Sequence, residues 1–91
     1  MVADLKPSLD GVWVEGTIAE KTETGMVQTR YGEALFCTAL LEDETGRIRI
    51  NLFRDQTQVK VGDRVIVENG FTNPYGELSI GKRGKITISK T

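Results

Sequence analysis

Apolar and polar residues alternate with a period of two along most of the chain, and this pattern predicts β-strands. The alternation is clearest in residues 47–54 (RIRINLFR), where every second side chain is apolar. Strands are also predicted over residues 12–19 (VWVEGTIA) and 64–71 (RVIVENGF), and the mostly apolar run 33–43 (EALFCTALLED) predicts a longer strand. A glycine inside a strand, as at Gly16, often marks the sharp bend of a small barrel.

The segments between these strands carry turn signals. Residues 22–32 form a polar connector with two glycines, and residues 43–46 (DETG) predict a tight turn because glycine accepts a positive φ. Residues 55–63 have room for one helical turn, with Asp55 as an N-cap candidate. Residues 77–88 predict a final strand or hairpin, which two glycines interrupt.

These elements predict an all-β fold in a single domain, residues 1–91. Five or six strands, corner glycines and one short helix or helical turn between strands 3 and 4 fit a five-stranded Greek-key barrel of the oligonucleotide/oligosaccharide-binding (OB) type. An SH3-like barrel is the main alternative, and the helical turn after the third strand favours the OB fold. The ending ITISKT favours one domain excised from a longer protein with several such barrels.

The composition argues against an enzyme. The chain has no histidine and a single cysteine, Cys37, in an apolar run. This excludes an intrachain disulfide and histidine-based catalysis, makes a zinc site implausible, and favours a buried structural thiol. There is no P-loop or dinucleotide-binding fingerprint. We therefore expect no catalytic residues, no metal and no cofactor.

Charge and hydropathy narrow the possible partners. A net charge of −1 argues mildly against nucleic-acid binding, whose usual footprint is a basic domain. From Leu78 onward, however, the chain carries basic residues and no acidic one. No apolar run is long enough for a membrane span or a signal peptide. We expect a protein without a membrane partner, in the cytoplasm and nucleoid of a prokaryote or the nucleus of a eukaryote.

One face of the most regular strand carries candidate binding residues: Arg47, Arg49, Asn51 and Phe53. Rings that stack on bases and guanidinium groups that contact phosphates are what a single-stranded nucleic acid requires. An ordinary solvated strand face, with Phe53 tucked under the helical turn, is an equally good interpretation of the spacing alone.

A second group of candidates lies in residues 67–88. Phe71 and Tyr75 flank a turn stiffened by Pro74, so either ring can be a stacking surface or can cover the barrel end. A bulge predicted at Asn69–Gly70 changes the side-chain parity, so alternation does not give the facing of Phe71. Basic candidates near this region and elsewhere are Lys82, Arg83, Lys85 and Arg30.

Trp13 is a further exposed-ring candidate, because its parity opposes that of Val12 and Val14. It is either a surface platform or a residue covered by the N-terminal segment LKPSL. We expect the second arrangement.

Four segments occur in an order that resembles a known family: DLKPSLDGVWVEGTI, QTRYG, LEDETGRIRINLF and VGDRVIVENGFTNPYGELSIG. Together they are similar to the OB domains of the archaeal single-stranded DNA-binding protein and replication protein A family, over nearly the whole chain. In that family one aromatic at the end of the third strand and two near the loop between the fourth and fifth strands stack on bases. The resemblance implies these roles for Phe53, Phe71 and Tyr75, although Trp is common at such positions.

The resemblance implies binding of single-stranded DNA with little sequence preference, in replication or repair. Two alternatives remain open: an RNA-binding OB module, and a protein-interaction OB domain that assembles with other OB domains or subunits. Rings accept either nucleic acid, so the sequence barely separates DNA from RNA.

Overall fold

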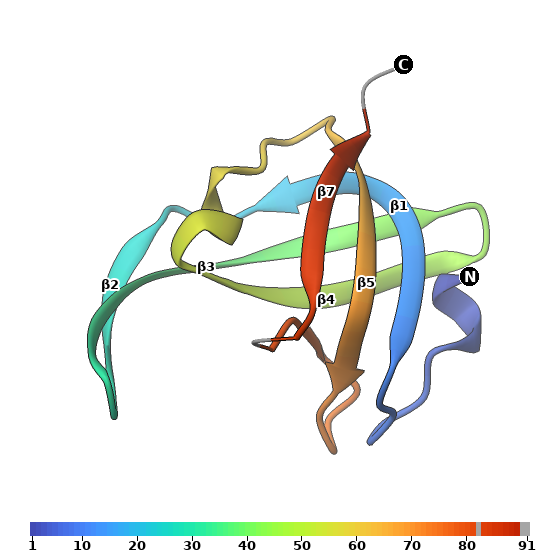
Figure 1. Ribbon diagram of the computed structural model, residues 1–91. Helices are drawn as coiled ribbons and strands as arrows, with labels where there is room; N and C mark the ends of the chain where they lie inside the picture. Colours follow the sequence, from blue (N-terminus) through green and yellow to red (C-terminus); the bar gives the residue numbers. More distant parts are fainter. Residues whose placement is uncertain (82, 90–91) are drawn as a thin grey trace.

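The computed structural model describes residues 1–81 and 83–89. Their secondary structure is almost entirely β (Figure 1). Two short 3-10 turns accompany the strands, one near the N-terminus and one between β4 and β5. The elements are η1 (Val2–Asp4), β1 (Val12–Lys21), β2 (Gly25–Thr29), β3 (Gly32–Asp43), β4 (Gly46–Phe53), η2 (Arg54–Gln58), β5 (Arg64–Thr72), β6 (Leu78–Ser79) and β7 (Lys85–Ser89).

Five strands close into a barrel. β1 pairs antiparallel with both β3 and β5, and β3 pairs antiparallel with β4. The two-residue strand β6 completes the ring, because it pairs parallel with β4 and antiparallel with β5. This arrangement confirms the predicted five-stranded OB barrel, including the helical turn η2 after β4.

Alternation along each strand directs one set of side chains into the barrel. Ile50 and Leu52 of β4 are fully buried, as the regular pattern of residues 47–54 predicts. Cys37 is 1% exposed and packs within the same core, which confirms the prediction of a buried thiol. The largest fully buried side chains are Ile18, Leu41, Ile50, Leu52, Leu78, Val14, Val65, Val67 and Cys37.

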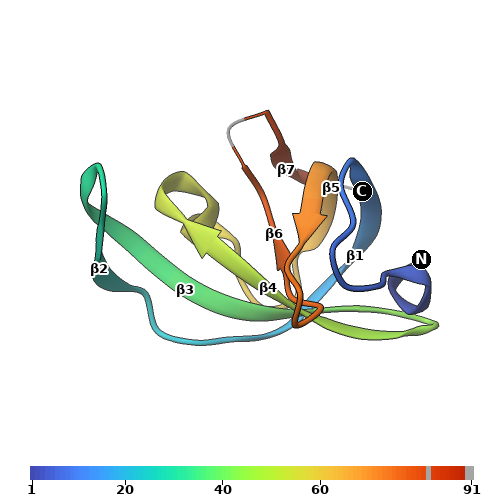
Figure 2. The same cartoon turned by 90° about the horizontal axis from the view of Figure 1, so that it is seen from below.

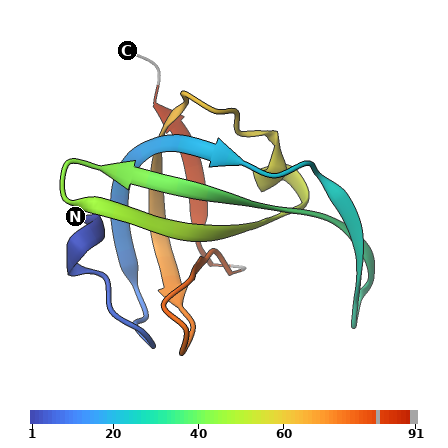
Figure 3. The same ribbon diagram turned by 180° about the vertical axis from the view of Figure 1, so that it is seen from behind.

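β1 curves strongly around the barrel, so that it serves two neighbours (Figures 1 and 3). Its first half pairs with β5 and its second half with β3, and the change occurs at Gly16–Thr17. A Cβ atom on Gly16 would lie 2.6 Å from the carbonyl oxygen of Glu42. A glycine is therefore required where the strand crosses from one neighbour to the other.

The N-terminal segment packs against one end of the barrel. Val2 is buried, and Leu5 and Leu9 pack against the core. The Thr72 hydroxyl donates to the Lys6 carbonyl at 2.6 Å and accepts from the Leu9 N–H at 2.7 Å. These contacts anchor the segment beside the end of β5.

Our expectation that this segment covers Trp13 is wrong. The Trp13 side chain is 58% exposed. The leucines of LKPSL pack into the barrel end instead, because burial against the existing core removes more apolar surface from water than a contact with one ring. Trp13 lies over a shallow hollow whose other lining residues are Met1, Glu15, Asp43, Glu44 and Arg64.

The polar connector predicted at residues 22–32 contains a strand. β2 pairs with the first part of β3 in a hairpin that reaches away from the barrel (Figures 1 and 2). Met26 pairs with Leu35 on the hairpin, and both side chains are exposed. No residue of β2 is buried, so the segment carries no alternation of apolar and polar residues that would signal a strand.

Three finer predictions can be compared with the structure. The bulge at Asn69–Gly70 is confirmed, because the β1–β5 register shifts there and Asn69 has a φ of 55°. The final strand is divided into β6 and β7, which both pair with β5. Asp55 is not an N-cap: η2 begins one residue earlier, and the Gln56 side chain accepts the Phe53 N–H instead.

Asp43 caps the tight turn between β3 and β4 and fastens the N-terminus to it. One carboxylate oxygen accepts from the Thr45 hydroxyl at 2.5 Å and the other from the Val2 N–H at 2.7 Å. These hydrogen bonds, the Thr45 hydroxyl first, lower the pKa of Asp43 from its usual 3.8 to about 2.

We predict an acid-dependent loss of stability from this carboxylate. Because its pKa is lower in the folded state, it stabilises the fold fully above pH 4 and this contribution disappears as the pH falls toward 2. Urea unfolding between pH 2 and 6 should show this dependence, and Asp43→Asn should reduce it. Glu44→Gln, at the exposed neighbour, controls for the change in charge. Identical pH profiles for wild type and Asp43→Asn would contradict the assignment.

Candidate nucleic-acid interface

The outward side chains of β3 and β4 form a continuous surface, called here the β3–β4 face. Antiparallel register pairs Phe36 with Phe53, Thr38 with Asn51 and Leu40 with Arg49. These six residues define the face. Directly opposed residues on one side of a sheet are close enough for their side chains to interact. The predicted grouping of Arg49, Asn51 and Phe53 on one side of the strand is therefore present in the fold.

An aromatic pair occupies one end of this face. The ring centroids of Phe36 and Phe53 are 4.9 Å apart, with an angle of 48° between the planes. Phe53 is only half-buried, so part of its ring remains accessible. Packing against Phe36 restricts the orientation of Phe53, while the turn η2 follows it directly in the chain.

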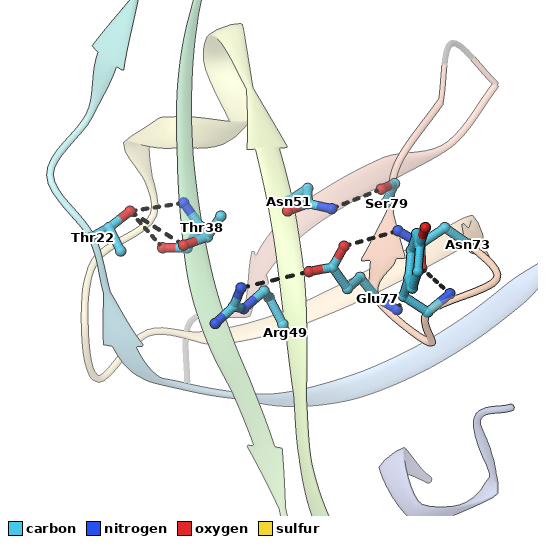
Figure 4. A network of polar contacts seen from close by, with 8 residues as sticks. Thr22, Thr38, Arg49, Asn51, Asn73, Glu77 and Ser79 are labelled. Carbon is cyan, nitrogen blue, oxygen red and sulfur yellow. Dashed lines mark hydrogen bonds and ion pairs between the residues drawn. The ribbon is translucent and has the colours of Figure 1, made fainter. Parts of the chain in front are cut away.

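A row of side chains continues from the face onto β6 and β5. Asn51 pairs with Ser79, and Ser79 pairs with Phe71. The Asn51 side-chain amide approaches the Ser79 hydroxyl at 3.4 Å (Figure 4). The parallel pairing of β6 with β4 therefore places Phe71 on the extension of the β3–β4 face.

Phe71 is both packed and accessible. Its ring is 38% exposed, and it lies close to Gly81, where an added Cβ would be 3.4 Å from Phe71 Cε1. Gly81 also lines a hollow of about 570 Å³ with Phe53. Phe53 and Phe71 therefore flank the same part of the surface. The remaining residues around the hollow are Tyr31, Arg54, Asp55, Gln56, Ile80 and Gly84.

Tyr75 lies in the loop between β5 and β6 and is 89% exposed. Asn73 orders this loop, because its side-chain oxygen accepts the N–H groups of Tyr75 and Glu77, each at 2.9 Å. The Asn73 main chain adds two hydrogen bonds, donating to the Glu77 carbonyl and accepting from the Gly76 N–H. The ring is thus held in solvent on a braced loop.

An ion pair connects this loop to the β3–β4 face. Arg49 Nη1 lies 3.6 Å from Glu77 Oε2, while Glu77 Oε1 accepts a hydrogen bond from Asn73 Nδ2 at 2.9 Å. Figure 4 shows the Arg49 and Glu77 side chains pointing toward one another, one from β4 and the other from the loop. A second hollow, of about 480 Å³, begins beside Arg49 and includes Lys21, Thr38 and Leu40 in its lining.

The other predicted basic residues are more dispersed. Arg47 forms an ion pair with Glu42 near the β3–β4 turn. Lys85 Nζ lies 3.8 Å from Glu68 Oε2 on the β5–β7 surface. Arg30 is exposed at the tip of the β2–β3 hairpin, and Arg83 is exposed after Gly81. Lys82 lies outside the described residues.

Three residues of this region were missed as site candidates. Phe36 was assigned to an apolar strand, although a buried Cys37 implies that its neighbour points outward. Tyr31, 71% exposed, lines the hollow beside Phe53. Glu77 carried no usable signal, because only the tertiary pairing brings it to Arg49.

Residues 1–81 and 83–89 contain no group of His, Cys, Asp and Glu side chains arranged to hold a metal ion. Within the same ranges, no helix has the length and apolar character needed to cross a membrane.

Similarity to known proteins agrees with the fold. No protein-family model matches the sequence. The "Single-stranded DNA binding protein Ssb" of Saccharolobus solfataricus is 32% identical in an alignment of 91 positions that covers 98% of this chain. The chain spans 62% of that relative's length.

Two solved structures share the architecture. A replication factor A related protein from Methanobacterium thermoautotrophicum has a TM-score of 0.76 at 16% identity, over 99% of this chain and 89% of that chain. An OB domain from Thermoplasma acidophilum has a TM-score of 0.73 at 26% identity, over 94% of this chain and 78% of that chain. The chain therefore has the OB fold, and over most of its length it is similar to a protein named for single-stranded DNA binding.

Proposed function

We propose that this domain binds single-stranded DNA with little sequence preference, through stacking of bases on Phe53, Phe71 and Tyr75. The observation that carries the proposal is the position of two accessible rings, Phe53 and Phe71, beside one hollow. Arg49 lies on the adjoining face, and its ion pair with Glu77 connects that face to the loop that presents the exposed ring of Tyr75. Each base has a π-face, so stacking tolerates any sequence. The similarity to a protein named for single-stranded DNA binding supports the same assignment.

The backbone of the strand would follow the basic residues at the edges of this surface. Arg49 lies on β4 opposite Leu40 of β3, and Arg30 lies at the tip of the β2–β3 hairpin. Arg83 comes two residues after Gly81, the glycine that lies close to the Phe71 ring. We assign phosphate contacts to these three arginines first. Arg47 and Lys85 are weaker candidates, because they lie outside the β3–β4 face. Arg47 pairs with Glu42 near the β3–β4 turn, and Lys85 pairs with Glu68 on the β5–β7 surface. Lys82 lies outside the described residues, and its assignment as a basic binding residue rests on the sequence alone.

Polar residues between the rings give the site a means of contacting base edges. Thr38, Asn51 and Ser79 form one row across three strands, between the Phe36–Phe53 pair and Phe71. Hydroxyl and amide groups both donate and accept hydrogen bonds, so they adapt to different bases. This combination favours binding without a strict sequence requirement.

We further propose that the domain is a binding module with no enzymatic activity, acting during DNA replication or repair. In a prokaryotic cell it would work in the cytoplasm, at the nucleoid. Other OB domains or subunits are candidate partners, because the relative it matches is longer than this chain. RNA is the second candidate ligand, since the same rings would accept its bases and only the 2′-hydroxyl separates the two.

A titration with oligo-dT of about ten nucleotides tests the ligand and the site together. We expect saturable changes in the amide NMR signals of Phe53, Phe71 and Tyr75 and smaller changes at Trp13, which lines a separate hollow. The affinity should fall as salt rises, with a slope of about −0.7 per phosphate contact. Absence of binding at low salt would refute the proposal, and tighter binding of a matched RNA would change the ligand assignment.

A further inference from the structure

We propose that Glu77 sets the affinity of the site by occupying Arg49 until a backbone phosphate replaces it. The inference rests on the function proposed above and concerns how that surface is regulated. It assigns a role to an acidic residue inside a surface that otherwise suits an anionic ligand. The two carboxylate oxygens of Glu77 have different partners: Oε1 contacts Asn73 and Oε2 faces Arg49.

The first oxygen, Glu77 Oε1, helps to order the loop between β5 and β6. Glu77 Oε1 accepts a hydrogen bond from Asn73 Nδ2, and the Glu77 N–H donates to Asn73 Oδ1, both at 2.9 Å. The Asn73 side chain also accepts the Tyr75 N–H. Glu77 is therefore a structural part of the loop that presents Tyr75, and its side chain is directed by that loop.

The second oxygen, Glu77 Oε2, faces Arg49 on β4. Glu77 Oε2 lies 3.6 Å from Arg49 Nη1, a separation beyond that of a well-formed charge-assisted hydrogen bond. The Arg49 side chain is 61% exposed and that of Glu77 is 31% exposed. Exposed ion pairs are weak, because water and salt screen them and the side chains lose entropy. A phosphate offers the same guanidinium a bidentate partner, so exchange of the carboxylate for a phosphate is favourable.

The consequence is an internal competitor for the ligand. Before binding, the carboxylate neutralises the one arginine that the fold places beside Asn51 on the β3–β4 face. During binding, the phosphate must displace the carboxylate and then lie near its negative charge. Removal of that charge should therefore tighten binding.

The decisive variant is Glu77→Gln. The glutamine side chain retains an oxygen that can accept a hydrogen bond from Asn73 Nδ2. The main-chain N–H of residue 77 still donates to Asn73 Oδ1, so both hydrogen bonds that order the loop are kept. Only the charge that faces Arg49 is lost. We expect the affinity for fluorescently labelled oligo-dT, measured by anisotropy at about 50 mM salt, to rise about threefold to tenfold. The dependence of log K on log salt should also steepen, by less than the value of about 0.7 for a whole phosphate contact. Wild type makes the same contact, but it must first break an ion pair that weakens as salt rises.

Glu15→Gln provides a matched control. Glu15 pairs with Arg64 at 3.1 Å, with side-chain exposures of 32% and 55% that resemble those of the Glu77–Arg49 pair. Glu15 and Arg64 both line the hollow beside Trp13, and none of the residues proposed to bind nucleic acid lines that hollow. The substitution changes the net charge by the same amount. We expect it to leave the salt slope unchanged and to alter the affinity less than twofold.

A third variant separates local release of Arg49 from a general charge effect. In the Glu77→Gln background, Arg49→Gln should remove both the gain in affinity and the steeper salt slope. Equal affinities and slopes for wild type and Glu77→Gln would overturn the inference while leaving the proposed function intact. Failure of the wild-type protein to bind oligo-dT would overturn the proposed function and this inference with it. An equal gain in Glu15→Gln would reduce the effect to net charge and also overturn the inference.

Discussion

Alanine at Tyr75 is expected to weaken the binding of oligo-dT by about 5-fold to 100-fold. The range follows from a stacking contribution of about 1–3 kcal/mol per base, a value known from single-stranded DNA-binding OB folds themselves. The ring is 89% exposed on a loop braced by Asn73, so its removal takes away a stacking surface and little else. Phe53→Ala should cost a similar amount, and the double variant should bind too weakly to measure at physiological salt.

Three controls make this result interpretable. Tyr75→Phe keeps the π-face and should bind within about threefold of wild type. Trp13→Ala removes a larger exposed ring from a separate hollow and should change nothing. Phe53 also packs against Phe36, so thermal unfolding must accompany that variant. Unchanged affinity in Tyr75→Ala, with the fold intact, would remove Tyr75 from the site.

The second large effect is on stability, and it comes from Gly16→Ala. The added methyl group would lie 2.6 Å from the Glu42 carbonyl oxygen and 3.1 Å from Leu41 Cδ1. The nearest atom belongs to the backbone of β3, which pairs with β1 at this point and cannot move alone. Overpacking of this kind costs about 2–3 kcal/mol, which corresponds to a fall in Tm of roughly 10–20 °C for a domain of this size.

Gly25→Ala is the matched comparison within a strand. No heavy atom lies within 4 Å of a Cβ built on Gly25. Alanine there should leave the Tm unchanged or raise it slightly, because it restricts the unfolded chain. Differential scanning calorimetry of both variants tests the contrast. A Tm for Gly16→Ala within about 3 °C of wild type would show that β1 can shift away from β3 at its bend.

Much of the fold follows from local sequence patterns. The alternation in residues 47–54 assigns Ile50 and Leu52 to the core, and both are fully buried. A mid-strand glycine predicts the bend of β1 at Gly16, and Asn69–Gly70 predicts the bulge in β5. These signals are readable because each reflects the conformation of a few consecutive residues. The β2 hairpin was missed for the same reason, since its pairing gives little burial and therefore little pattern.

The candidate site is only partly readable in this way. Alternation correctly directs Arg49, Asn51 and Phe53 outward, because the parity of a regular strand determines which side of the sheet each residue occupies. Whether these residues bind DNA remains a prediction. The same parity also directs Trp13 outward, and it does not separate a ring on the candidate surface from a ring elsewhere.

The amino-acid sequence specified the strands of the barrel, the inward and outward side of each regular strand, and the buried thiol, because neighbouring residues impose these features on one another. It did not specify which outward residues meet. Ser79 of β6 pairs with Asn51 of β4 and with Phe71 of β5. By closing the barrel in this way, β6 extends the candidate surface to the Phe71 ring. Glu77 reaches Arg49 only across the same closure. Such contacts join residues far apart in the chain, so no local periodicity encodes them, and the folded barrel alone brings them together.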